Sequence, residues 1–442
     1  MNSFDLLIKG GTVVLPDRVV QADIGITGEK IAAVDNLSSA KAVKILEAKN
    51  LHVLPGVIDT QVHFREPGLT HKEDLSTGTK SAILGGVTGI FEMPNTVPLT
   101  LTRELHQEKI KAGEGRTYCD YAFFIGGSKE NVGQLNELEN LPGCPGVKIF
   151  MGSSTGSLLV EDDEVLTSIL KNGKKRVAVH AEDEPRLRER KQIAIDGAHP
   201  RFHPIWRDEE TALKATTRLL NASRAAGNRP VHVLHVTTAQ EMELLGKNRD
   251  IATVEVTPQH LTLAAPECYD RLGTYAQMNP PIRDQKHQDA LWKALQNGIV
   301  DMIGSDHAPH THEEKQHHYP QSHSGMPGVQ TLLPLMLNHV AAGKLSLQKL
   351  VDLTSHNPAR IWNIQNKGKI ETGFDADLVL VDLNRVEKID HKNMAYKCGW
   401  TPFDGMKVTG WPVATILRGQ IAVKEGQILT PPRGQHISFN NN

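Results

Sequence analysis

The sequence predicts an α/β protein: a (β/α)8 barrel of the TIM type, with a small β-sandwich domain formed by both termini. Short apolar runs alternate with stretches of helical character through the middle of the chain. Eight candidate strands end near His63, Pro94, Gly126, Phe150, His180, Val236, Thr257 and Gly304. Eight βα units over roughly 250 residues or more match the size of such a barrel. A doubly wound open sheet is the competing arrangement, but no GxGxxG motif follows the first strand to favour its dinucleotide-binding form.

The two ends of the chain have a different character from its middle. Apolar alternation bounded by glycine, as in residues 6–11 and 23–26, predicts half-buried strands, and residues 376–381 and 413–417 return to this pattern. We therefore expect residues 1–54 and 366–442 to form the sandwich and residues 55–365 to form the barrel. Residues 103–112 and 285–297 are expected to be barrel helices. The polar residues 431–442 are expected to form a frayed tail.

Composition excludes several classes of protein. The formal net charge of -2 over 442 residues provides no basic surface for nucleic acid. No apolar stretch reaches the roughly 20 residues needed to span a bilayer, and the N-terminus lacks the features of a signal peptide. Four cysteines lie far apart without CxxC spacing, which suggests reduced thiols in a cytoplasmic protein.

Five residues able to bind a metal stand at the ends of five separate apolar runs. They are His63, Lys148, His180, His235 and Asp306. In a barrel of parallel strands, the carboxyl ends of the strands meet at one face, where catalytic residues gather. Imidazoles combined with carboxylate-type oxygens suit zinc or a related divalent ion. The pattern predicts a metal-dependent hydrolase.

Each of these residue types also has a structural explanation that involves no metal. Lys148 interrupts the apolar run 146–150, where burial would lower its pKa and allow the amine to capture carbon dioxide as a carbamate. It could equally point outwards with its ammonium group in solvent. His180 and His235 taken singly are typical core histidines, and only their equivalent positions at strand ends favour metal binding. His232, three residues before His235, faces the other side of the strand and is assigned a structural role.

A second group of residues is suited to binding substrate or moving protons. Asp306 can bind a metal and shuttle a proton, although an aspartate after a strand is often an N-cap. Arg65 can bind a substrate carboxylate bidentately, or lie in solvent. Asn95 and Asn279 can supply amide hydrogen bonds, or serve as turn residues. His310 closes the segment that Asp306 opens and is the histidine of the loop 307–323 to which we assign a substrate role.

Several segments together resemble the dihydroorotases of the amidohydrolase superfamily. The matching segments are residues 55–59, 63–68, 93–96, 257–261, 279–283, 305–310, 356–359 and 398–403. The resemblance covers nearly the whole chain. It implies reversible cyclisation of N-carbamoyl-L-aspartate to L-dihydroorotate, in the biosynthesis of pyrimidines, by a metal-activated hydroxide.

The resemblance also implies a role for each site residue. Lys148 would be a carboxylated lysine bridging two zinc ions, His180 and His235 would bind one ion, and His63 would bind the other. Asp306 would be a ligand and the general acid/base. The substrate carboxylate would be held by Arg65, Asn95 and His310, with Asn279 nearby.

One position departs from the family's pattern. The first strand of the family usually ends in His-x-His, whereas this chain has Gln61 in place of the first histidine. An amide is a poorer zinc ligand than a neutral imidazole. Gln61 is therefore a doubtful ligand, and one or two zinc ions per chain are both compatible with the sequence.

Two alternative functions remain open. Allantoinases and hydantoinases of the same superfamily also open cyclic ureides, and Arg65 is the discriminating residue because their substrates lack the carboxylate. The other alternative is a non-catalytic subunit that supports aspartate transcarbamoylase. We expect a small-molecule substrate, no nucleic-acid or membrane partner, a homo-oligomer (dimer or tetramer) and a contact with aspartate transcarbamoylase as one candidate interaction.

Overall fold

Parallel strands enclose the centre of the molecule. The computed structural model describes residues 3–153 and 158–440. The strands of the barrel are β6 (Val57–Val62), β7 (Val87–Glu92), β8 (Asp120–Phe123), β9 (Ile125–Gly126), β10 (Val147–Phe150), β11 (Val177–His180), β12 (Val231–Val233), β13 (Ala252–Val256) and β14 (Met302–Ile303). Because β8 and β9 are two parts of one strand interrupted at Phe124, the barrel has the predicted eight positions. All their pairings are parallel, and a bridge between Val62 and His307 brings the first strand beside the segment after the last.

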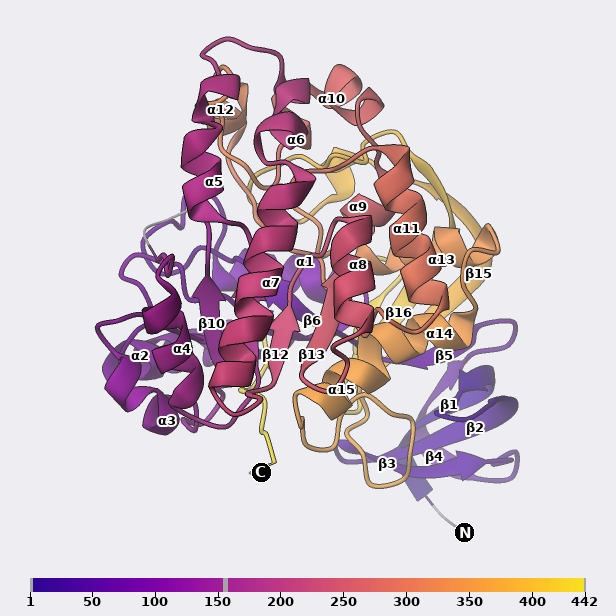
Figure 1. The fold of residues 1–442 in the computed structure, drawn as a ribbon. Helices are drawn as coiled ribbons and strands as arrows, with labels where there is room; N and C mark the ends of the chain where they lie inside the picture. Colours follow the sequence, from indigo (N-terminus) through magenta and orange to yellow (C-terminus); the bar gives the residue numbers. More distant parts are fainter. Residues whose placement is uncertain (1–2, 154–157, 441–442) are drawn as a thin grey trace.

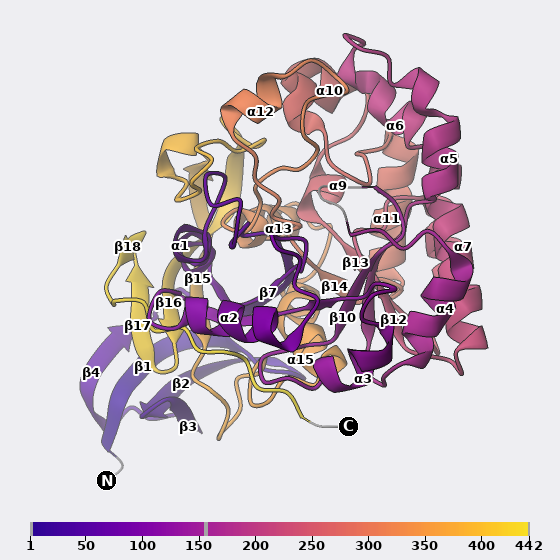
Figure 2. The ribbon, with the colours of Figure 1, turned by 90° about the vertical axis from the view of Figure 1, so that its left-hand side faces the viewer.

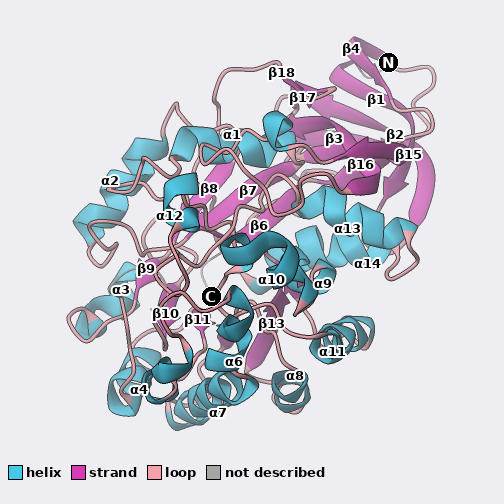
Figure 3. Ribbon diagram, turned by 90° about the horizontal axis from the view of Figure 1, so that it is seen from above, coloured by secondary structure: helices cyan, strands magenta, loops and turns pink. Residues whose placement is uncertain are grey.

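A ring of helices covers the outside of these strands, as the view down the barrel shows (Figure 3). Its longer members are α1 (Leu75–Leu84), α2 (Arg103–Gly113), α4 (Asp163–Lys171), α7 (Glu209–Ala225), α8 (Ala239–Gly246), α11 (Gln285–Gln296) and α13 (Leu332–Ala341). Every residue of the barrel strands is buried, since the strands face side chains inside the barrel and helices outside. The predicted barrel is confirmed, and the helices expected at 103–112 and 285–297 are α2 and α11.

Local sequence explains where these helices begin. Asp74, Thr102, Asp208 and Asp284 precede α1, α2, α7 and α11, and each side chain accepts a hydrogen bond from a backbone N–H of the first turn. Shorter helices lie in the connections: α3 (Leu135–Leu138), α5 (Glu184–Glu189), α6 (His203–Trp206), α9 (Pro258–Thr262), α10 (Glu267–Leu272), α12 (His312–Gln316), α14 (Leu347–Val351) and α15 (Asn357–Ile361). Over the described residues, none of the helices has the length and apolar character needed to cross a membrane.

Both ends of the chain contribute to one further sheet beside the barrel (Figures 1 and 2). Its strands are β1 (Ser3–Val14), β2 (Val19–Thr27), β3 (Lys30–Asp35), β4 (Lys41–Glu47), β5 (His52–Pro55), β15 (Leu378–Lys388), β16 (Lys407–Leu417), β17 (Gln420–Lys424) and β18 (Gln427–Ile428). They follow the order β18-β17-β16-β15-β5-β1-β2-β3, with β4 paired to β1. The sheet curls around its own core, since Ile26 of β2, Leu380 of β15 and Ile416 of β16 belong to one buried cluster.

The C-terminal residues are not a frayed tail, and that expectation is wrong for residues 433–439. The backbone N–H of Ile437 donates to the carbonyl of Tyr121 at 2.8 Å, and the Ile437 side chain is 1% exposed. The ring of Phe439 packs edge-on against Phe91, with centroids 5.7 Å apart. Both side chains pack in one apolar cluster with residues of the barrel strands, where Ile437 is buried and Phe439 is half-buried, and this packing fixes the segment.

A buried cluster of charges joins the barrel to the curled sheet. Lys367 Nζ lies 2.7 Å from an oxygen of Asp120 in β8, 3.0 Å from Asp375 and 2.5 Å from Asp377. Arg418, in the turn between β16 and β17, also contacts Asp120. These carboxylates raise the pKa of Lys367 despite its burial, so the lysine is charged throughout the neutral range.

Replacement of this buried lysine tests the energetic importance of the cluster. Lys367→Met leaves buried carboxylates without their cation, and we expect it to lower the free energy of unfolding by about 3–5 kcal/mol in denaturant titrations. Lys30→Met is the matched control, because Lys30 pairs with Asp375 at 2.6 Å but its side chain is 45% exposed. The control should cost no more than about 1 kcal/mol. Equal losses in the two variants would show that the cluster does not hold the two parts together.

Candidate active site

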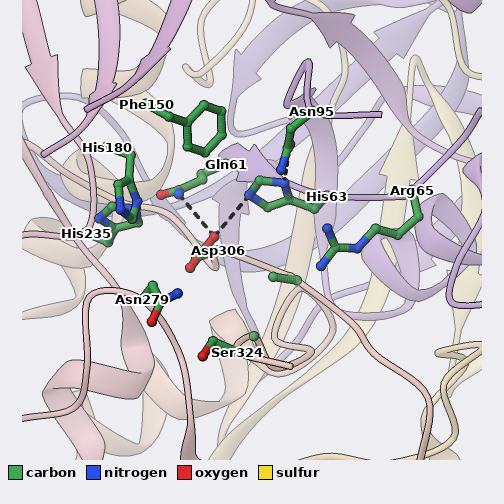
Figure 4. A pocket seen from close by; sticks show the side chains of 12 residues that line it. Gln61, His63, Arg65, Asn95, Phe150, His180, His235, Asn279, Asp306 and Ser324 are labelled. Carbon is green, nitrogen blue, oxygen red and sulfur yellow. Dashed lines mark hydrogen bonds and ion pairs between the residues drawn. The ribbon is translucent and has the colours of Figure 1, made fainter. Parts of the chain in front are cut away.

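A pocket opens at the carboxyl ends of the barrel strands. Its walls consist of Gln61, His63, Arg65, Asn95, Phe150, His180, His235, Asn279, Asp306, Ala308, Ser324 and Gly325. All the site residues expected from the sequence lie in this wall except Lys148 and His310, which are fully buried. Figure 4 shows the side chains converging from opposite sides of the barrel on Asp306.

Asp306 occupies the centre of this group in a strained backbone conformation. Its φ of 44° lies in the left-handed region, which a non-glycine residue adopts only where its surroundings hold it there. The amide nitrogen of Gln61 donates to Oδ1 at 3.1 Å, and His63 Nε2 lies 3.3 Å from the same oxygen. Burial raises the pKa of the Asp306 carboxyl to about 6.

His63 is oriented by an amide. Its Nδ1 lies 2.9 Å from Asn95 Oδ1, which can only accept, so the proton is on Nδ1 and Nε2 has a free lone pair. That lone pair faces the oxygen of Asp306. Burial lowers the pKa of His63 well below its ordinary value and keeps the imidazole neutral. Two acceptors that face each other in this way favour a cation between them.

His180 and His235 form a second pair of facing groups. His180 Nε2 donates to the Glu182 carboxylate at 2.9 Å, so its Nδ1 is unprotonated and points at His235 Nε2, 3.1 Å away. Arg207 donates to both oxygens of Glu182, with Nε at 3.0 Å and Nη2 at 2.6 Å. Burial lowers the pKa of both histidines, so each is a neutral imidazole, the form that binds metals.

Lys148 points into the protein, not outwards. It is 0% exposed, and its Nζ has no hydrogen-bond partner among the residues that the structure describes. The ammonium position lies 4.4 Å from the centre of the Phe150 ring. Burial lowers the pKa of Lys148 to about 7, which gives a substantial neutral fraction at physiological pH.

These residues fit the divalent metal that the sequence predicts. Across residues 3–153 and 158–440, the buried atoms Lys148 Nζ and Gln61 Oε1 have no hydrogen-bond partner. Neutral imidazoles, a carboxylate and an amide oxygen together form a donor set that suits zinc or a related ion. Such an ion would supply the interactions that the buried polar atoms lack.

Another group of potential ligands lies next to the pocket but is less suitable for a cation. His310, Glu314 and His323 have ligand atoms within 4.8 Å of one another. The ammonium group of Lys72 lies 2.7 Å from Glu314 and already neutralises that carboxylate.

Arg65 and Asn279 occupy the opposite sides of the pocket. Arg65 is 2% exposed, and its Nε donates to the carbonyl of Pro309 at 3.2 Å. Its Nη2 lies 3.3 Å from His310 Nε2. Asn279 Oδ1 accepts from His203 Nε2 at 3.0 Å, which fixes its side chain in the wall of the pocket.

Sequence reasoning missed several residues of the site. Glu182 stands two positions after His180, and this proximity is the only feature of the sequence that points to a place for Glu182 in the site. Arg207 and Ser324 come from distant segments and have no distinguishing local pattern. The sequence identifies Phe150 only as the end of a strand, and its place in the wall of the pocket depends on the direction of its ring.

Comparisons with known proteins agree with this architecture. The Amidohydrolase family profile matches residues 52–422. A dihydroorotase of Methanosarcina acetivorans is 33% identical over 98% of this chain and 95% of its own length, and one of Pyrococcus horikoshii is 34% identical over 100% and 97%. Among solved structures, an L-hydantoinase (dihydropyrimidinase) from Arthrobacter aurescens has a TM-score of 0.94 at 31% identity, covering 98% of this chain and 100% of its own. The barrel and its pocket are thus those of a hydrolase superfamily. The chain belongs to the amidohydrolase family.

Removal of the buried amine tests the metal-binding role of the pocket. We expect Lys148→Met to weaken zinc binding at least about tenfold, because the site loses one of its converging groups. Zinc per chain, measured by mass spectrometry of the metal after dialysis, gives the result. Lys109→Met is the control, since Lys109 is also buried, with Nζ 4.9 Å from the centre of the Phe123 ring, but lies on α2. Equal zinc content in all three proteins would remove Lys148 from the metal site.

Proposed function

We propose that the protein is a dihydroorotase that catalyses the reversible cyclisation of N-carbamoyl-L-aspartate to L-dihydroorotate in pyrimidine biosynthesis. The similarity to dihydroorotases over nearly the whole chain supports this proposal. The observation that carries it is the position of Arg65 in the pocket.

Arg65 is a buried cation that forms no close ion pair with any carboxylate in the part of the chain that the structure describes. Among the described residues, none of the carboxylates lies within 4.0 Å of its guanidinium group, although the side chain is almost completely buried. A buried charge of this kind is costly unless it is paired. A substrate carboxylate entering the pocket would provide the pair with bidentate geometry. L-dihydroorotate has such a carboxylate, and simple hydantoins and dihydropyrimidines do not.

The metal would be held by a defined set of side chains. These are His63, Lys148, His180, His235 and Asp306, with Gln61 as a weaker ligand. When bound, it would activate water and polarise the ring carbonyl as a Lewis acid. Since Gln61 offers an amide where the family has an imidazole, we expect the position beside His63 to bind its ion less tightly than the position between His180 and His235.

We propose further that Lys148 is carboxylated. Its neutral amine, favoured by burial, attacks carbon dioxide, a C–N bond forms and one proton leaves, which gives an anionic carbamate. The carbamate oxygens would then supply the negative charge that a divalent ion requires. This assignment is supported by the Lys148 Nζ, which has no hydrogen-bond partner among the described residues, and by its lowered pKa.

The remaining steps belong to the chain's own residues. Arg65, His310 and Asn95 hold the substrate carboxylate and so orient the ring. Asp306 accepts a proton from the attacking water and delivers it to the departing ring nitrogen. A carboxyl group with a pKa near 6 is suited to both transfers close to neutral pH, because neither protonation state is strongly disfavoured.

A hydantoinase or dihydropyrimidinase is the second candidate, because of the structural similarity to the Arthrobacter enzyme. Hydrolysis of L-dihydroorotate, hydantoin and dihydrouracil by the zinc-loaded protein in bicarbonate buffer decides between them. Preference for L-dihydroorotate supports our proposal, and preference for the uncharged rings reverses it. Lack of activity on all three would favour the non-catalytic subunit.

Replacement of the arginine tests the basis of this preference. We expect Arg65→Met to raise the KM for L-dihydroorotate about tenfold to a hundredfold, because a charge-assisted contact to the carboxylate is lost. Any residual hydrolysis of hydantoin should stay within about twofold of the wild-type value. A similar loss for both substrates would mean that Arg65 supports the site in general and does not recognise the carboxylate.

Replacement of the central carboxylate tests proton transfer. Asp306→Asn should lower kcat by about a hundredfold to ten-thousandfold, because an amide cannot accept the proton. Circular dichroism and zinc content identify any loss of structure or metal. If the folded, zinc-loaded variant keeps a tenth or more of wild-type kcat, Asp306 is not the proton carrier.

A further inference from the structure

Lys72 contacts His310, one of the residues that would hold the substrate carboxylate. It belongs to the connection between β6 and α1 and is 3% exposed. Its Nζ lies 2.7 Å from Glu314 Oε1 and 3.2 Å from His310 Nδ1. His310 in turn lies against Arg65, whose Nη2 is 3.3 Å from His310 Nε2. Lys72 is therefore in contact with the carboxylate-binding group without lining the pocket.

The contact with Lys72 determines which ring nitrogen of His310 is protonated. An ammonium group can only donate, so His310 Nδ1 must accept from it. The proton of the neutral ring is then on Nε2. This nitrogen lies 3.1 Å from the carbonyl oxygen of Ser324, which can only accept. Both contacts require the same tautomer, with the proton on Nε2.

Two other contacts would require the opposite tautomer, and both are longer. Glu314 Oε2 lies 3.5 Å from His310 Nδ1, at the limit of a hydrogen bond, and already accepts from the backbone N–H of Thr311 at 3.0 Å. Arg65 Nη2 lies at 3.3 Å from Nε2. A doubly protonated ring is disfavoured, because burial and the neighbouring Arg65 and Lys72 lower the pKa of His310 well below its ordinary value.

The same segment also lies beside another histidine near the pocket. Glu73 Oε2 lies 3.5 Å from His307 Nε2, and the backbone N–H of Gly328 donates to His307 Nδ1 at 3.1 Å. The proton of His307 is thus on Nε2, toward Glu73. Lys72 and Glu73, which are consecutive in the connection between β6 and α1, therefore lie beside His310 and His307 respectively.

We propose that Lys72 is a positioning residue that fixes His310 with its proton on Nε2, so that His310 and Arg65 present adjacent N–H donors to the substrate carboxylate. This inference rests on the proposed function. The carboxylate replaces the Ser324 carbonyl as acceptor for His310. Access to the ring depends on Gly325, since a Cβ at this position would lie 3.0 Å from His310 Nε2 and 2.5 Å from the Ala308 carbonyl oxygen.

The tautomer can be observed directly. We suggest long-range nitrogen–proton correlation spectra of zinc-loaded protein labelled with 15N at histidine, with the His310 signals assigned by their absence in His310→Phe. Wild-type protein should show an unprotonated Nδ1 and a protonated Nε2. In Lys72→Met the His310 signals should shift to the opposite tautomer or to a mixture, and in Lys72→Arg, which can still donate, they should resemble the wild type.

Two further variants separate Lys72 from its neighbours. Glu314→Gln should keep the wild-type tautomer, because Lys72 still donates to Nδ1, and it provides the test if Lys72→Met does not fold. Lys397→Met is the matched control, since Lys397 pairs with Asp74 at 2.8 Å near the same connection and is 37% exposed. A changed tautomer in Glu314→Gln, or an unchanged one in folded Lys72→Met, would overturn the proposal.

Kinetics test whether the tautomer serves substrate binding. Lys72→Met should raise the KM for L-dihydroorotate about tenfold and change kcat by less than about twofold, as expected for loss of uniform binding. In a His310→Phe background the same change should have an effect of less than about twofold, because Lys72 acts through His310. An equal effect of Lys72→Met on KM in both backgrounds would show that Lys72 does not act through His310. Absence of wild-type turnover would refute the proposed function, while the spectra would still decide the role of Lys72.

Discussion

The site depends on the hydrogen bond that closes the barrel between its first and last strands. The backbone N–H of His63 donates to the carbonyl of His307 at 2.7 Å, just beyond β6 and β14. A second contact, from the Ser305 N–H to Asp59 Oδ1 at 3.0 Å, ties the same two segments together. These bonds hold Asp306 at its positive φ and place its carboxylate beside Gln61 and His63. The contacts that close the barrel therefore also bring together the site residues of its first and last strands.

Burial then sets the charge state of the whole group. It lowers the pKa values of His63, His180 and His235 and that of Lys148, while it raises the pKa of Asp306. All these shifts favour the neutral form, because each group has left water for a medium that solvates charge poorly. Neutral imidazoles and a neutral amine are the forms that bind metal ions or react with carbon dioxide. Burial in the barrel thus favours the forms that the proposed metal site and the proposed carboxylation of Lys148 require.

Substrate preference within this family can depend on groups outside the metal site. The fold is shared with a hydantoinase at a TM-score of 0.94, so the backbone alone does not distinguish a charged ring from an uncharged one. Arg65 provides the charge that would make this distinction. In our proposal, Lys72 orients His310, so that its Nε2–H donates to the substrate carboxylate beside Arg65. In our proposal, substrate specificity therefore depends both on the buried Arg65 and on the hydrogen bonds that orient the residues beside it.

The sequence alone determined the barrel, the helices α2 and α11 and most of the polar residues that line the pocket, because strand ends in a parallel barrel converge wherever the chain alternates regularly. It left open whether Lys148 points inwards, since a pentapeptide does not specify which face of a strand meets the barrel interior. It also mispredicted the C-terminal segment, where Ile437 and Phe439 find apolar partners only after the barrel has formed. The contacts of Glu182 with Arg207 and of Lys72 with His310 were likewise decided by tertiary structure. Each joins segments distant in sequence, and hydrogen bonds of this kind leave no periodic pattern in the chain.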